Sequence, residues 1–407
     1  MLTLKLAIRN LLRNTRRTIL TVMLIGFSLT ALILADALTL GMLDILVNSV
    51  TKNVVGEAQI HKPGFRQNLD VDLYLSETEK IRDSLDQDPT IAAYSERVIS
   101  GGMMSSSYNV ATGLMYGINA DAEGQVTQLP DAIVEGTYLT GTQGEILIGN
   151  ELADLLEITL GDRLVITLSE ANSGELAQAL FRVSGIFHFG IEGVDTGLVF
   201  ANLRQARSVI GLSDQQSHEF ALRFTDPSLA TMPGTQVYRQ LNTDNIETLN
   251  WLELNKPIAS IIEMSGLSSV IIGSILFILA GLGVINSMFM SIYERLYEFG
   301  VVKALGARPA RLAALILLEA LLIALISCLA GMTLGYLLGS YAAENGVPMG
   351  EFQVSGIAID NRVLLRLELY QFIQYPLFVI CLTVVAALYP ARFAARIIPT
   401  EALQRSL

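Results

Sequence analysis

The sequence predicts an α-helical membrane protein with four transmembrane helices and an α+β extracytoplasmic domain inserted between the first and the second of them. Three observations support this fold class. Four stretches contain the roughly 20 mostly apolar residues that a helix needs to cross a bilayer. Only 16% of the 407 residues are charged, whereas an ordinary soluble domain has about 25%. Between the first two stretches, residues 47–265 alternate between apolar and polar as a soluble domain does.

The elements are expected in a definite order along the chain. Residues 1–17 form an amphipathic cytoplasmic segment, and the first transmembrane helix at 18–46 continues outward as a stalk. The remaining boundaries are the outer domain at 47–265, the second transmembrane helix at 266–292, a cytoplasmic loop at 293–311, the third helix at 312–341, an outer loop at 342–370, the fourth helix at 371–390 and a cytoplasmic tail at 391–407.

The distribution of charge sets the expected orientation. Residues 1–17 carry five basic side chains and no acidic one, whereas residues 46–265 carry 13 Lys or Arg against 29 Asp or Glu. Because short cytoplasmic segments are enriched in positive charge, both termini and the 293–311 loop are expected in the cytoplasm. Cleavage of the first helix as a signal peptide is disfavoured, because its apolar core is longer than about 7–15 residues and Asp36 interrupts the small pair Ala35 and Ala37.

Short strands and short helices are expected to mix in the outer domain, which makes it α+β. Ser76–Leu85 is predicted to be a helix in which Ser76 is the N-cap and Glu79 completes a capping box. Further helices are expected at 151–156 and 203–210, and a hairpin loop at 169–176. Strands are expected at 57–61, 114–118, 145–148, 163–168, 179–189, 197–201 and 219–224.

Several functional classes find no support in the sequence. No nucleophile, base and orienting acid occur at a recognisable spacing, so no catalytic residue is expected. Cys328 and Cys381 lie in apolar runs, and no metal-ligand pattern occurs. The net charge of −12 disfavours nucleic acid as a partner. The phosphate-binding pattern G-x-x-x-x-G-K-[ST] does not occur, so no nucleotide site and no cofactor are expected on this chain.

The loop between the second and third spans has the most specific sequence. It reads Tyr293-Glu-Arg-Leu-Tyr-Glu-Phe-Gly300-Val-Val-Lys-Ala-Leu-Gly306-Ala-Arg-Pro-Ala-Arg311. Glu294 and Glu298 are one helical turn apart on one face, which is expected to be exposed. Gly300 and Gly306 allow the backbone to bend or to be approached closely. Two interpretations stay open: a short helix that docks into a soluble partner, or an amphipathic anchor at the membrane surface.

Small and charged residues inside the spans are the remaining candidates. Gly331, Gly335 and Gly339 recur every four residues, a pattern that permits close helix packing within the chain or across a dimer. Asp36 and Glu319 are intramembrane carboxylates, which are costly and by default suggest a functional site. The alternatives are an interfacial position for Asp36 and, for Glu319, snorkelling or a pair with Arg311 or Lys303. No chain of acids or histidines crosses the membrane, so a proton relay is not expected.

The 293–311 loop resembles the pattern ERxxEΦGΦΦ[KR]AxGA of the MacB/FtsX/LolCE-type ABC transporter permeases. The resemblance covers almost the whole chain. It implies two permeases, identical or paralogous, in the bacterial inner membrane. Each of them binds a cytoplasmic ATPase, which holds ATP and Mg²⁺. It implies that the loop couples to the ATPase through Glu294, Arg295, Glu298, Gly300, Lys303, Gly306 and Ala307. Other stretches similar to the family are Ala7–Leu11, Arg16–Thr18, Gly144–Gly149, Leu160–Asp162, Leu388–Arg392, Ala394–Arg396 and Pro399–Leu403.

The resemblance leaves several functions open. A separate permease of this length is most similar to the LolC and LolE type, which implies release of lipoproteins or lipids with a periplasmic chaperone. The MacB type implies peptide or drug efflux through a periplasmic adaptor, and the opening at residues 7–18 is closer to that type. The FtsX type implies a mechanotransmitter that switches a cell-wall hydrolase, although its outer domain is generally smaller. Membrane lipids are a further expected partner, and a membrane-anchored enzyme is the least favoured function.

Overall fold

The computed structural model describes residues 2–350, 352–354, 356–359 and 362–398. The chain divides into two compact units. The membrane unit consists of Met1–Leu43, Ile262–Gly350 and Asn361–Leu407, and the outer domain consists of Asp44–Ile261 together with Glu351–Asp360. The predicted fold class, in which an α+β domain separates the first two of four transmembrane helices, is confirmed.

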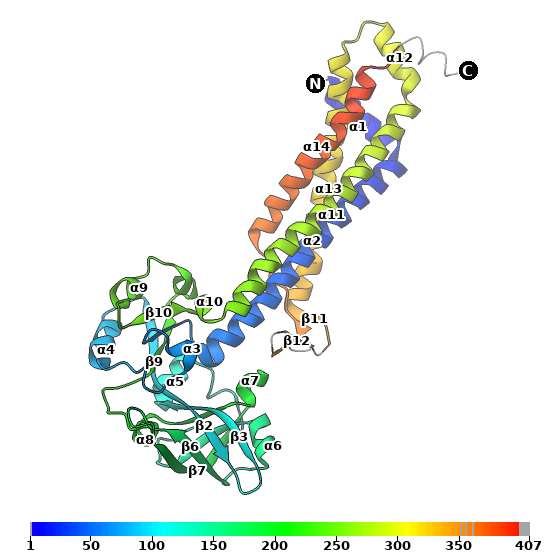
Figure 1. Ribbon diagram of the computed structural model, residues 1–407. Coiled ribbons are helices and arrows are strands. Elements are labelled where there is room, and N and C mark those ends of the chain that lie inside the picture. The colour runs from blue at the N-terminus through cyan, green and yellow to red at the C-terminus, as the bar shows by residue number, and fades with distance from the viewer. Residues whose placement is uncertain (1, 351, 355, 360–361, 399–407) are drawn as a thin grey trace. The chain divides into compact units, whose positions relative to one another are not determined.

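The membrane unit is built from long apolar helices. In the described part of the chain, four helical segments are long and apolar enough to cross a membrane: Thr15–Val55, Lys256–Glu294, Pro309–Asn345 and Leu369–Ala395. The helices of this unit run together in Figure 1, and the short helices α1 and α12 lie at the same end of it. The helices are α1 Leu2–Arg13, α2 Thr15–Val50, α11 Lys256–Glu294, α12 Leu296–Ala304, α13 Pro309–Asn345, the 3-10 turn η3 Leu369–Phe372 and α14 Gln374–Ala395.

The helices α2 and α13 approach each other closely. Gly331 of α13 faces Gly26 of α2, and a Cβ added to Gly331 would be 2.7 Å from the Gly26 carbonyl oxygen. Thr30 Oγ1 of α2 donates a hydrogen bond to the Gly331 carbonyl oxygen at 3.0 Å. Two small residues therefore let the backbones approach, and a hydroxyl uses that approach to join the two helices.

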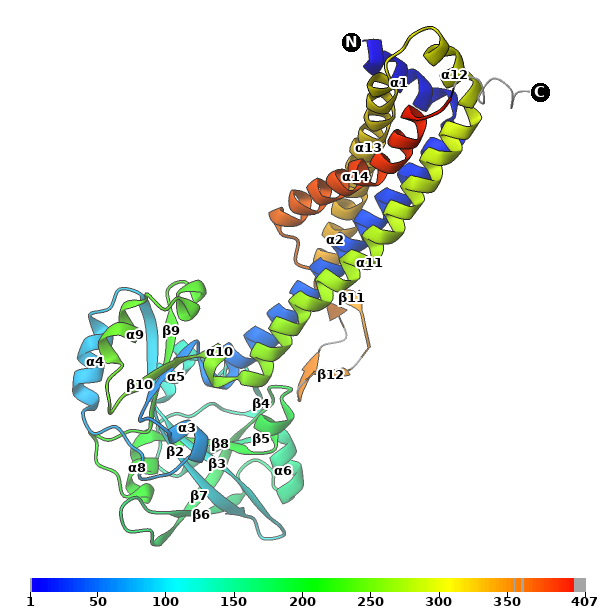
Figure 2. The ribbon, with the colours of Figure 1, turned by 45° about the horizontal axis from the view of Figure 1, so that its top comes forward.

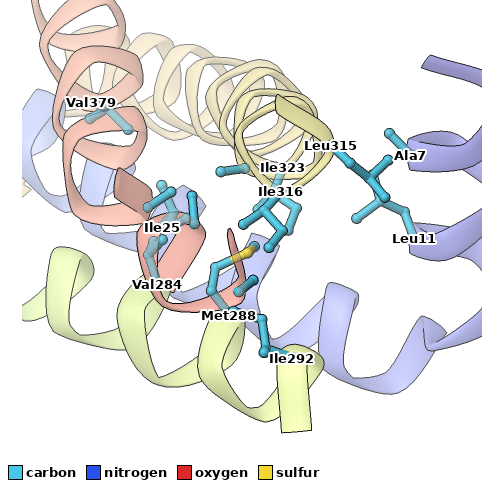
Figure 3. Packing of buried hydrophobic residues seen from close by; sticks show 14 of the residues in the cluster. Ala7, Leu11, Ile25, Val284, Met288, Ile292, Leu315, Ile316, Ile323 and Val379 are labelled. Atoms are coloured by element: carbon cyan, nitrogen blue, oxygen red, sulfur yellow. The ribbon is translucent and has the colours of Figure 1, made fainter. Parts of the chain in front are cut away.

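The other two glycines of α13 also pack within the chain. Gly335 lies against Ile33 of α2, and Gly339 lies against Leu367 in the segment before α14. The glycine face of α13 is thus covered by its own subunit. Around it a buried apolar core joins the helices of the membrane unit, as Figure 3 shows for Ala7, Leu11, Ile25, Val284, Met288, Ile292, Leu315, Ile316, Ile323 and Val379.

Within the described residues, the main sheet of the outer domain has ten strands. Six of them pair in a closed ring in the order β2–β3–β8–β5–β7–β6, because β6 pairs with both β7 and β2. Figure 2 shows these strands packed together. The strands are β1 Ala58–His61, β2 Ile91–Ser105, β3 Val110–Ile118, β4 Ile133–Gly136, β5 Glu145–Gly149, β6 Arg163–Ser169, β7 Leu176–Phe187, β8 Leu198–Asn202, β9 Glu219–Phe224 and β10 Glu247–Asn250.

Four strands extend the sheet beyond this ring: β4 pairs with β7, and three others lie on the side of β2. β9 pairs with β2, β1 pairs with β9, and β10 pairs with β1 at the edge. β1 follows α2 in the chain and β10 precedes α11, and the two strands are antiparallel with Ala58 opposite Asn250. The chain therefore enters and leaves the outer domain through two neighbouring strands.

Helices cover the outer domain at several points. The helix predicted at 203–210 and the strand predicted at 219–224 coincide with α8 and β9, and the predicted hairpin loop joins β6 to β7. The predicted N-cap at Ser76 is wrong: Leu75 bridges to Ser217 in extended form, so α4 starts only at Thr78 and its N-cap Glu77 makes no side-chain bond. The helices are α3 Phe65–Asn68, α4 Thr78–Asp86, α5 Ala120–Val126, α6 Asn150–Leu156, α7 Glu192–Asp195, α8 Leu203–Ile210, η2 Pro227–Thr231, α9 Gln236–Leu241 and α10 Trp251–Leu254.

The segment predicted as an outer loop at 342–370 contains two short hairpins. β11 Val347–Pro348 pairs with β14 Arg362–Val363, and β12 Phe352–Val354 pairs with β13 Ile357–Ile359. The β12–β13 hairpin belongs to the outer domain. Its backbone bonds to the loop before α7, through Ala358 N–H to the Gly190 carbonyl at 2.8 Å and Glu192 N–H to the Gly356 carbonyl at 3.0 Å.

Candidate functional site

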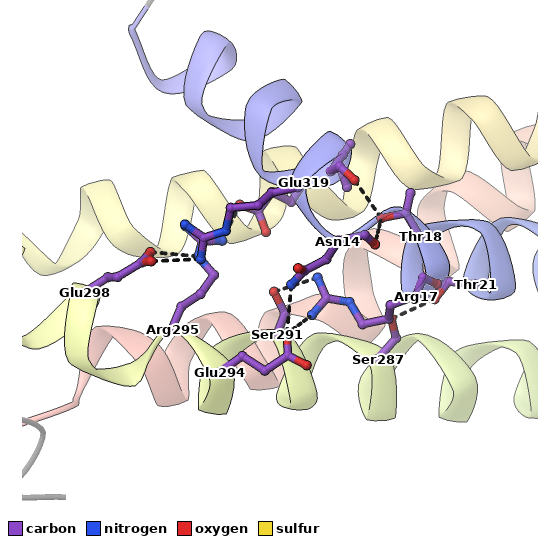
Figure 4. A network of polar contacts seen from close by, with 12 residues as sticks. Asn14, Arg17, Thr18, Thr21, Ser287, Ser291, Glu294, Arg295, Glu298 and Glu319 are labelled. Carbon is purple, nitrogen blue, oxygen red and sulfur yellow. Dashed lines mark hydrogen bonds and ion pairs between the residues drawn. The ribbon is translucent and has the colours of Figure 1, made fainter. Parts of the chain in front are cut away.

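The segments that the sequence marked as basic meet at one end of the membrane unit. α1 and the start of α2 lie against the end of α11, and α12 follows directly (Figure 4). The C-terminal end of α14 reaches the same region, because Lys303 of α12 bonds to the last carbonyl groups of that helix. The polar side chains here form two neighbouring groups, one that joins α2 to α11 and one that joins α1, α12 and α13, and we call them together the helix-end network. Its charged members are Arg13, Arg17, Glu294, Arg295, Glu298 and Glu319.

Glu294 joins the end of α11 to the start of α2. Arg17 Nη1 lies 2.9 Å from Glu294 Oε2, and Asn14 Nδ2 donates to the same oxygen at 2.8 Å. Arg17 Nη2 donates to Ser291 Oγ at 3.0 Å. One turn deeper, the Thr21 and Ser287 hydroxyls bond to each other at 2.7 Å. Polar contacts therefore connect α2 and α11 over two helical turns.

Glu319 is buried and paired with Arg295. Arg295 Nη1 donates to Glu319 Oε1 at 2.9 Å, and Asn10 Nδ2 of α1 donates to the same oxygen at 2.6 Å. Glu319 is 3% exposed and Arg295 is 6% exposed. The predicted pairing of Glu319 with Arg311 or Lys303 is wrong. Arg311 is exposed, and the Lys303 amine is bonded at the end of α14. A buried carboxylate needs a charged partner and full hydrogen bonding, which Arg295 and Asn10 supply.

Glu298 is only half exposed and is engaged on both sides. Arg13 Nη2 donates to Glu298 Oε1 at 2.8 Å, and Arg295 Nε lies 3.4 Å from Oε2. Partial burial alone would raise the pKa of the Glu298 carboxyl, but the bond and charge of Arg13, with Arg295 beside it, hold that pKa below its usual range. Glu294 and Glu298 lie exposed, as expected, and both carboxylates are also bound by basic residues of the same chain.

In the second half of α12, Lys303 and Gly306 each have a structural role. Lys303 Nζ donates to the carbonyl oxygens of Ala395 at 2.8 Å and Ile397 at 2.7 Å, and so satisfies groups that the end of α14 leaves without a helical partner. Gly306 has φ of +92°, with its N–H bonded to the Lys303 carbonyl, while Ala307 N–H bonds to the Val302 carbonyl. These two bonds define a Schellman motif, which favours glycine at the left-handed position.

The exposed surface of α12 includes large apolar side chains beside Glu298, and the sequence alone did not mark them. Tyr297, Val302 and Leu305 are exposed large apolar residues, and Leu305 is 83% exposed at the tip of the helix. Arg308 and Arg311 are exposed just beyond it. Gly300, in contrast, lies buried inside α12. The signal that could have found this surface was the position of Leu305 directly before Gly306, where the helix ends and its last side chain projects.

Asp36 lies away from the helix-end network, further along α2. It is buried and accepts hydrogen bonds from Tyr370 Oη at 2.5 Å and Gln371 Nε2 at 2.7 Å, both in η3. Neutral donors thus satisfy this carboxylate and tie α2 to the start of α14. The two intramembrane carboxylates of the sequence are therefore not brought together. Among the described residues, no three His, Cys, Asp or Glu side chains are grouped so as to hold a metal ion.

The fold and the helix-end network define a class of protein: a multi-pass membrane protein whose large α+β domain interrupts its helices after the first span. A family described as MacB-like periplasmic core domain matches residues 18–232, more than half of the chain, and one described as FtsX-like permease C-terminal matches residues 270–399. The chain belongs to the FtsX- and MacB-like permeases of ABC transporters, as its sequence motifs indicated.

Relatives of established name agree with this family. The lipoprotein-releasing system transmembrane protein LolC of Xylella fastidiosa is 24% identical over 329 residues, which cover 78% of each chain. LolC of Neisseria meningitidis is 23% identical over 333 residues, 77% of this chain and 78% of that protein. The macrolide export ATP-binding/permease protein MacB of Shewanella oneidensis is 32% identical over 175 residues, 42% of this chain but 23% of that protein. With its four apolar helices, the chain is a bacterial inner membrane protein.

Proposed function

We propose that this protein is the permease subunit of an ABC transporter whose ATPase is a separate cytoplasmic polypeptide. ATP hydrolysis in that partner moves the outer domain, and this movement extracts or exports lipoproteins or lipids at the outer face of the inner membrane. Two permeases, either identical or paralogous, bind a dimer of ATPases. The permease itself contributes no catalytic residue and no cofactor, since ATP and Mg²⁺ bind to the partner.

One observation carries the coupling role: α12, together with the end of α11 directly before it, is connected to α2, α13 and α14 at this end of the membrane unit. Arg295, at the start of α12, is paired with Glu319 of α13, and Lys303 is bonded to the end of α14. Directly before α12, Glu294 is bonded to Arg17 of α2. A displacement of α12 is therefore passed to α2, α13 and α14 without an intervening flexible link.

The free surface of α12 supports docking of a soluble partner. Tyr297 and Leu305 present aromatic and aliphatic area next to the exposed guanidinium groups of Arg308 and Arg311. Large apolar side chains surrounded by arginines are typical of protein interfaces, and a short amphipathic helix in a groove is a recurring mode of recognition. In this proposal the apolar tip, and not the acidic residues, makes the main contact with the ATPase.

The orientation of the chain is part of the proposal. The basic segments 1–17 and 293–311 lie at the same end of the membrane unit, as the positive-inside rule requires of cytoplasmic segments. This end therefore faces the cytoplasm and the outer domain faces the periplasm. Single-cysteine labelling of the intact cell tests the assignment: residue 150 is expected to react with a membrane-impermeant reagent, and the exposed positions 9 and 308 to react only after the membrane is opened.

The choice of lipoproteins or lipids as substrate rests on the extent of the similarity. The LolC relatives match over more than three quarters of both chains, whereas MacB matches over less than a quarter of its own length. The second candidate is efflux of a peptide or drug with a periplasmic adaptor, which the MacB-like outer domain favours. The third, favoured by the FtsX-like match at 270–399, is force transmission to a periplasmic hydrolase without movement of a substrate.

The test of the coupling role is co-purification with the ABC ATPase subunits of the same organism. The wild-type permease is expected to retain one ATPase, whereas Leu305→Asp places a charge at the centre of the proposed contact and lowers the retained ATPase by about tenfold or more. Leu155→Asp, at an exposed leucine of the outer domain, is the matched control and is expected to retain it. If Leu305→Asp binds the ATPase like the wild type, α12 is only a membrane anchor.

A further inference from the structure

The end of α2 is anchored inside the outer domain in an unusual way. α2 runs into the π-helical turn η1 Thr51–Val55, and helix ends leave backbone carbonyl groups without partners. Three of these carbonyls are taken by groups of the outer domain. Gln128 N–H bonds to the Lys52 carbonyl at 2.7 Å, Arg97 Nη1 to the Val54 carbonyl at 2.6 Å, and Gln59 Nε2 to the Val55 carbonyl at 2.7 Å.

Arg97 is the centre of this anchor. It is fully buried in β2, with 0% of its surface exposed. Its guanidinium binds Glu123 of α5 through two nitrogens, at 2.6 and 3.0 Å, and Glu219 of β9 at 2.9 Å. With the Val54 carbonyl, one side chain joins the end of α2 to β2, β9 and α5. Its rigid fork has the geometry that such simultaneous contacts need.

The charge of Arg97 makes these contacts obligatory. Burial alone would lower the pKa of Arg97, but Glu123 and Glu219 raise it above its ordinary value, so the guanidinium stays charged. A buried charge that loses a partner is strongly destabilised, because no water replaces the lost contact. Glu123 is held in turn by the hydroxyls of Ser95 and Thr127. The cluster therefore has one satisfied arrangement, and the end of α2 is part of it.

The backbone that connects α2 to the outer domain is more flexible than the contacts of Arg97. The next residue after η1 is Gly56, which has φ of +78°, and the chain then enters β1. Glycine is the residue with the fewest backbone restrictions, so rotation at Gly56 would absorb a displacement of the helix. The side-chain contacts of Arg97 bypass this position.

We propose that Arg97 is the positioning residue that passes a displacement of α2 along its axis to the strands β2 and β9 of the outer domain. This rests on the proposed function, in which the ATPase moves the transmembrane helices. The partner of the anchor is the helix itself, through the Val54 carbonyl. Without Arg97, the bonds of Gln128 and Gln59 to the Lys52 and Val55 carbonyls still hold the end of α2, and the domain remains folded. The direct bond from the helix end to the cluster of β2, β9 and α5 is lost, so movement of the helix is no longer passed directly to these strands.

Arg207, which pairs with the neighbouring residue Glu96 of β2, supplies a matched control. Glu96 is buried and binds Arg207 of α8, whose Nη2 lies 3.1 Å from Ser217 Oγ and whose Nε lies 3.0 Å from the Gln216 carbonyl. This second buried arginine also joins a helix to the sheet. None of its bonds, however, reaches residues 44–56. Arg97 and Arg207 are both buried arginines paired with carboxylates, and only Arg97 contacts the end of α2.

The experiment is amide hydrogen exchange on the full chain carrying Arg97→Lys or Arg207→Lys, alone and bound to its ATPase with ATP and vanadate. Lysine keeps the charge but presents a single nitrogen, which cannot hold two carboxylates and a carbonyl in the same geometry. In the chain alone, Arg97→Lys is expected to speed exchange at residues 52–61 about tenfold, and Arg207→Lys to leave it unchanged. Thermal unfolding of both variants shows whether each is folded.

The nucleotide-bound complex tests transmission. In the wild type and in Arg207→Lys, trapping is expected to change exchange both at residues 44–55 and in β2 and β9. In Arg97→Lys the change is expected at residues 44–55 only. A change in β2 and β9 that persists in Arg97→Lys overturns the role of Arg97. If the wild type shows no nucleotide-dependent change at all, the proposed function itself fails, and the role of Arg97 in transmission fails with it.

Discussion

The guanidinium of Arg295 lies 2.9 Å from the carboxylate of Glu319, 24 residues further along the chain, and both side chains are buried. Arg295 is the residue at which α11 ends and α12 begins. The pair therefore fixes the direction of the chain where it leaves one transmembrane helix. The pair is buried in an apolar unit. Removal of one member therefore leaves the other as a buried charge without a partner, which destabilises the fold.

Removal of one partner is expected to cost more than removal of both. Glu319→Leu or Arg295→Met alone should lower the free energy of unfolding by about 3–5 kcal/mol, because each leaves a buried charge. The double variant should be more stable than the sum of the two losses implies. Denaturant unfolding of the purified protein in detergent measures all four species. Additive losses would show that Arg295 and Glu319 do not depend on each other.

Substitution of Gly306 tests the Schellman motif at the end of α12. Gly306→Ala places a side chain at φ of +92° and is expected to cost about 1 kcal/mol, although nothing lies within 4 Å of the added Cβ. Gly306→Asn should cost less, because asparagine adopts the left-handed conformation more readily than alanine. Hydrogen exchange at residues 302–307 reports the change. Equal exchange in both variants would mean that the loop adjusts without strain.

Reversal of the two acidic residues of the loop is expected to change both the binding of the ATPase and the contacts between the helix ends. Glu294→Lys with Glu298→Lys is expected to lower retention of the ATPase, but also to repel Arg17 and Arg13 and so to detach α1 from α12. A charge swap separates the two effects. Arg13→Glu with Glu298→Arg restores the pair with reversed sign, and its retention of the ATPase should approach that of the wild type.

That swap has a clear contrary outcome. Arg13 and Glu298 are roughly half exposed, so the pair itself contributes little stability, on the order of 0–1 kcal/mol. Expression and thermal stability should therefore change little in the single variants as well as in the swap. If the swap retains no more ATPase than Glu298→Arg alone, Glu298 contacts the ATPase directly.

The outer domain is expected to lose stability in acid. His218 is buried and fixed as the neutral tautomer, because Ile99 N–H donates to its Nδ1 at 2.9 Å and its Nε2 lies 2.9 Å from the Val71 carbonyl. Burial, the largest cause, lowers the pKa of the His218 imidazole below its usual range. The stability from the neutral ring is thus complete above the unfolded pKa of about 6.5 and is lost as pH falls towards the folded pKa.

The size of this effect is limited by the linkage relation. One such histidine changes the free energy of unfolding by at most about 1.4 kcal/mol for each pH unit between the two pKa values. Thermal unfolding between pH 8 and pH 5 measures it. His218→Leu should flatten the acid side of the profile, while His188→Gln, at an exposed histidine, should not. An unchanged slope in His218→Leu would contradict the assignment.

The elements that the sequence predicted well are those decided by local pattern. Helix lengths and hydropathy identify the spans, and apolar periodicity places α8 at 203–210. β2 escaped prediction although it is 15 residues long, because Ser95, Glu96 and Arg97 interrupt its apolar pattern. These polar residues are buried because they are paired across the sheet, which local pattern cannot indicate. The same holds for Glu319, whose partner was chosen from nearby residues and lies instead at the start of α12.

The pairing of β1 with β10 places the beginning and the end of the inserted sequence next to each other. The strand that follows α2 and the strand that precedes α11 lie side by side, with Ala58 opposite Asn250. Across such a pair the Cα atoms are about 4.5–5.5 Å apart, a gap that a tight turn of two residues closes. The sequence between these two strands can therefore vary in length without separating its two ends, although the β12–β13 hairpin of the outer domain lies outside it. One set of four helices could in this way acquire outer domains of very different size and purpose.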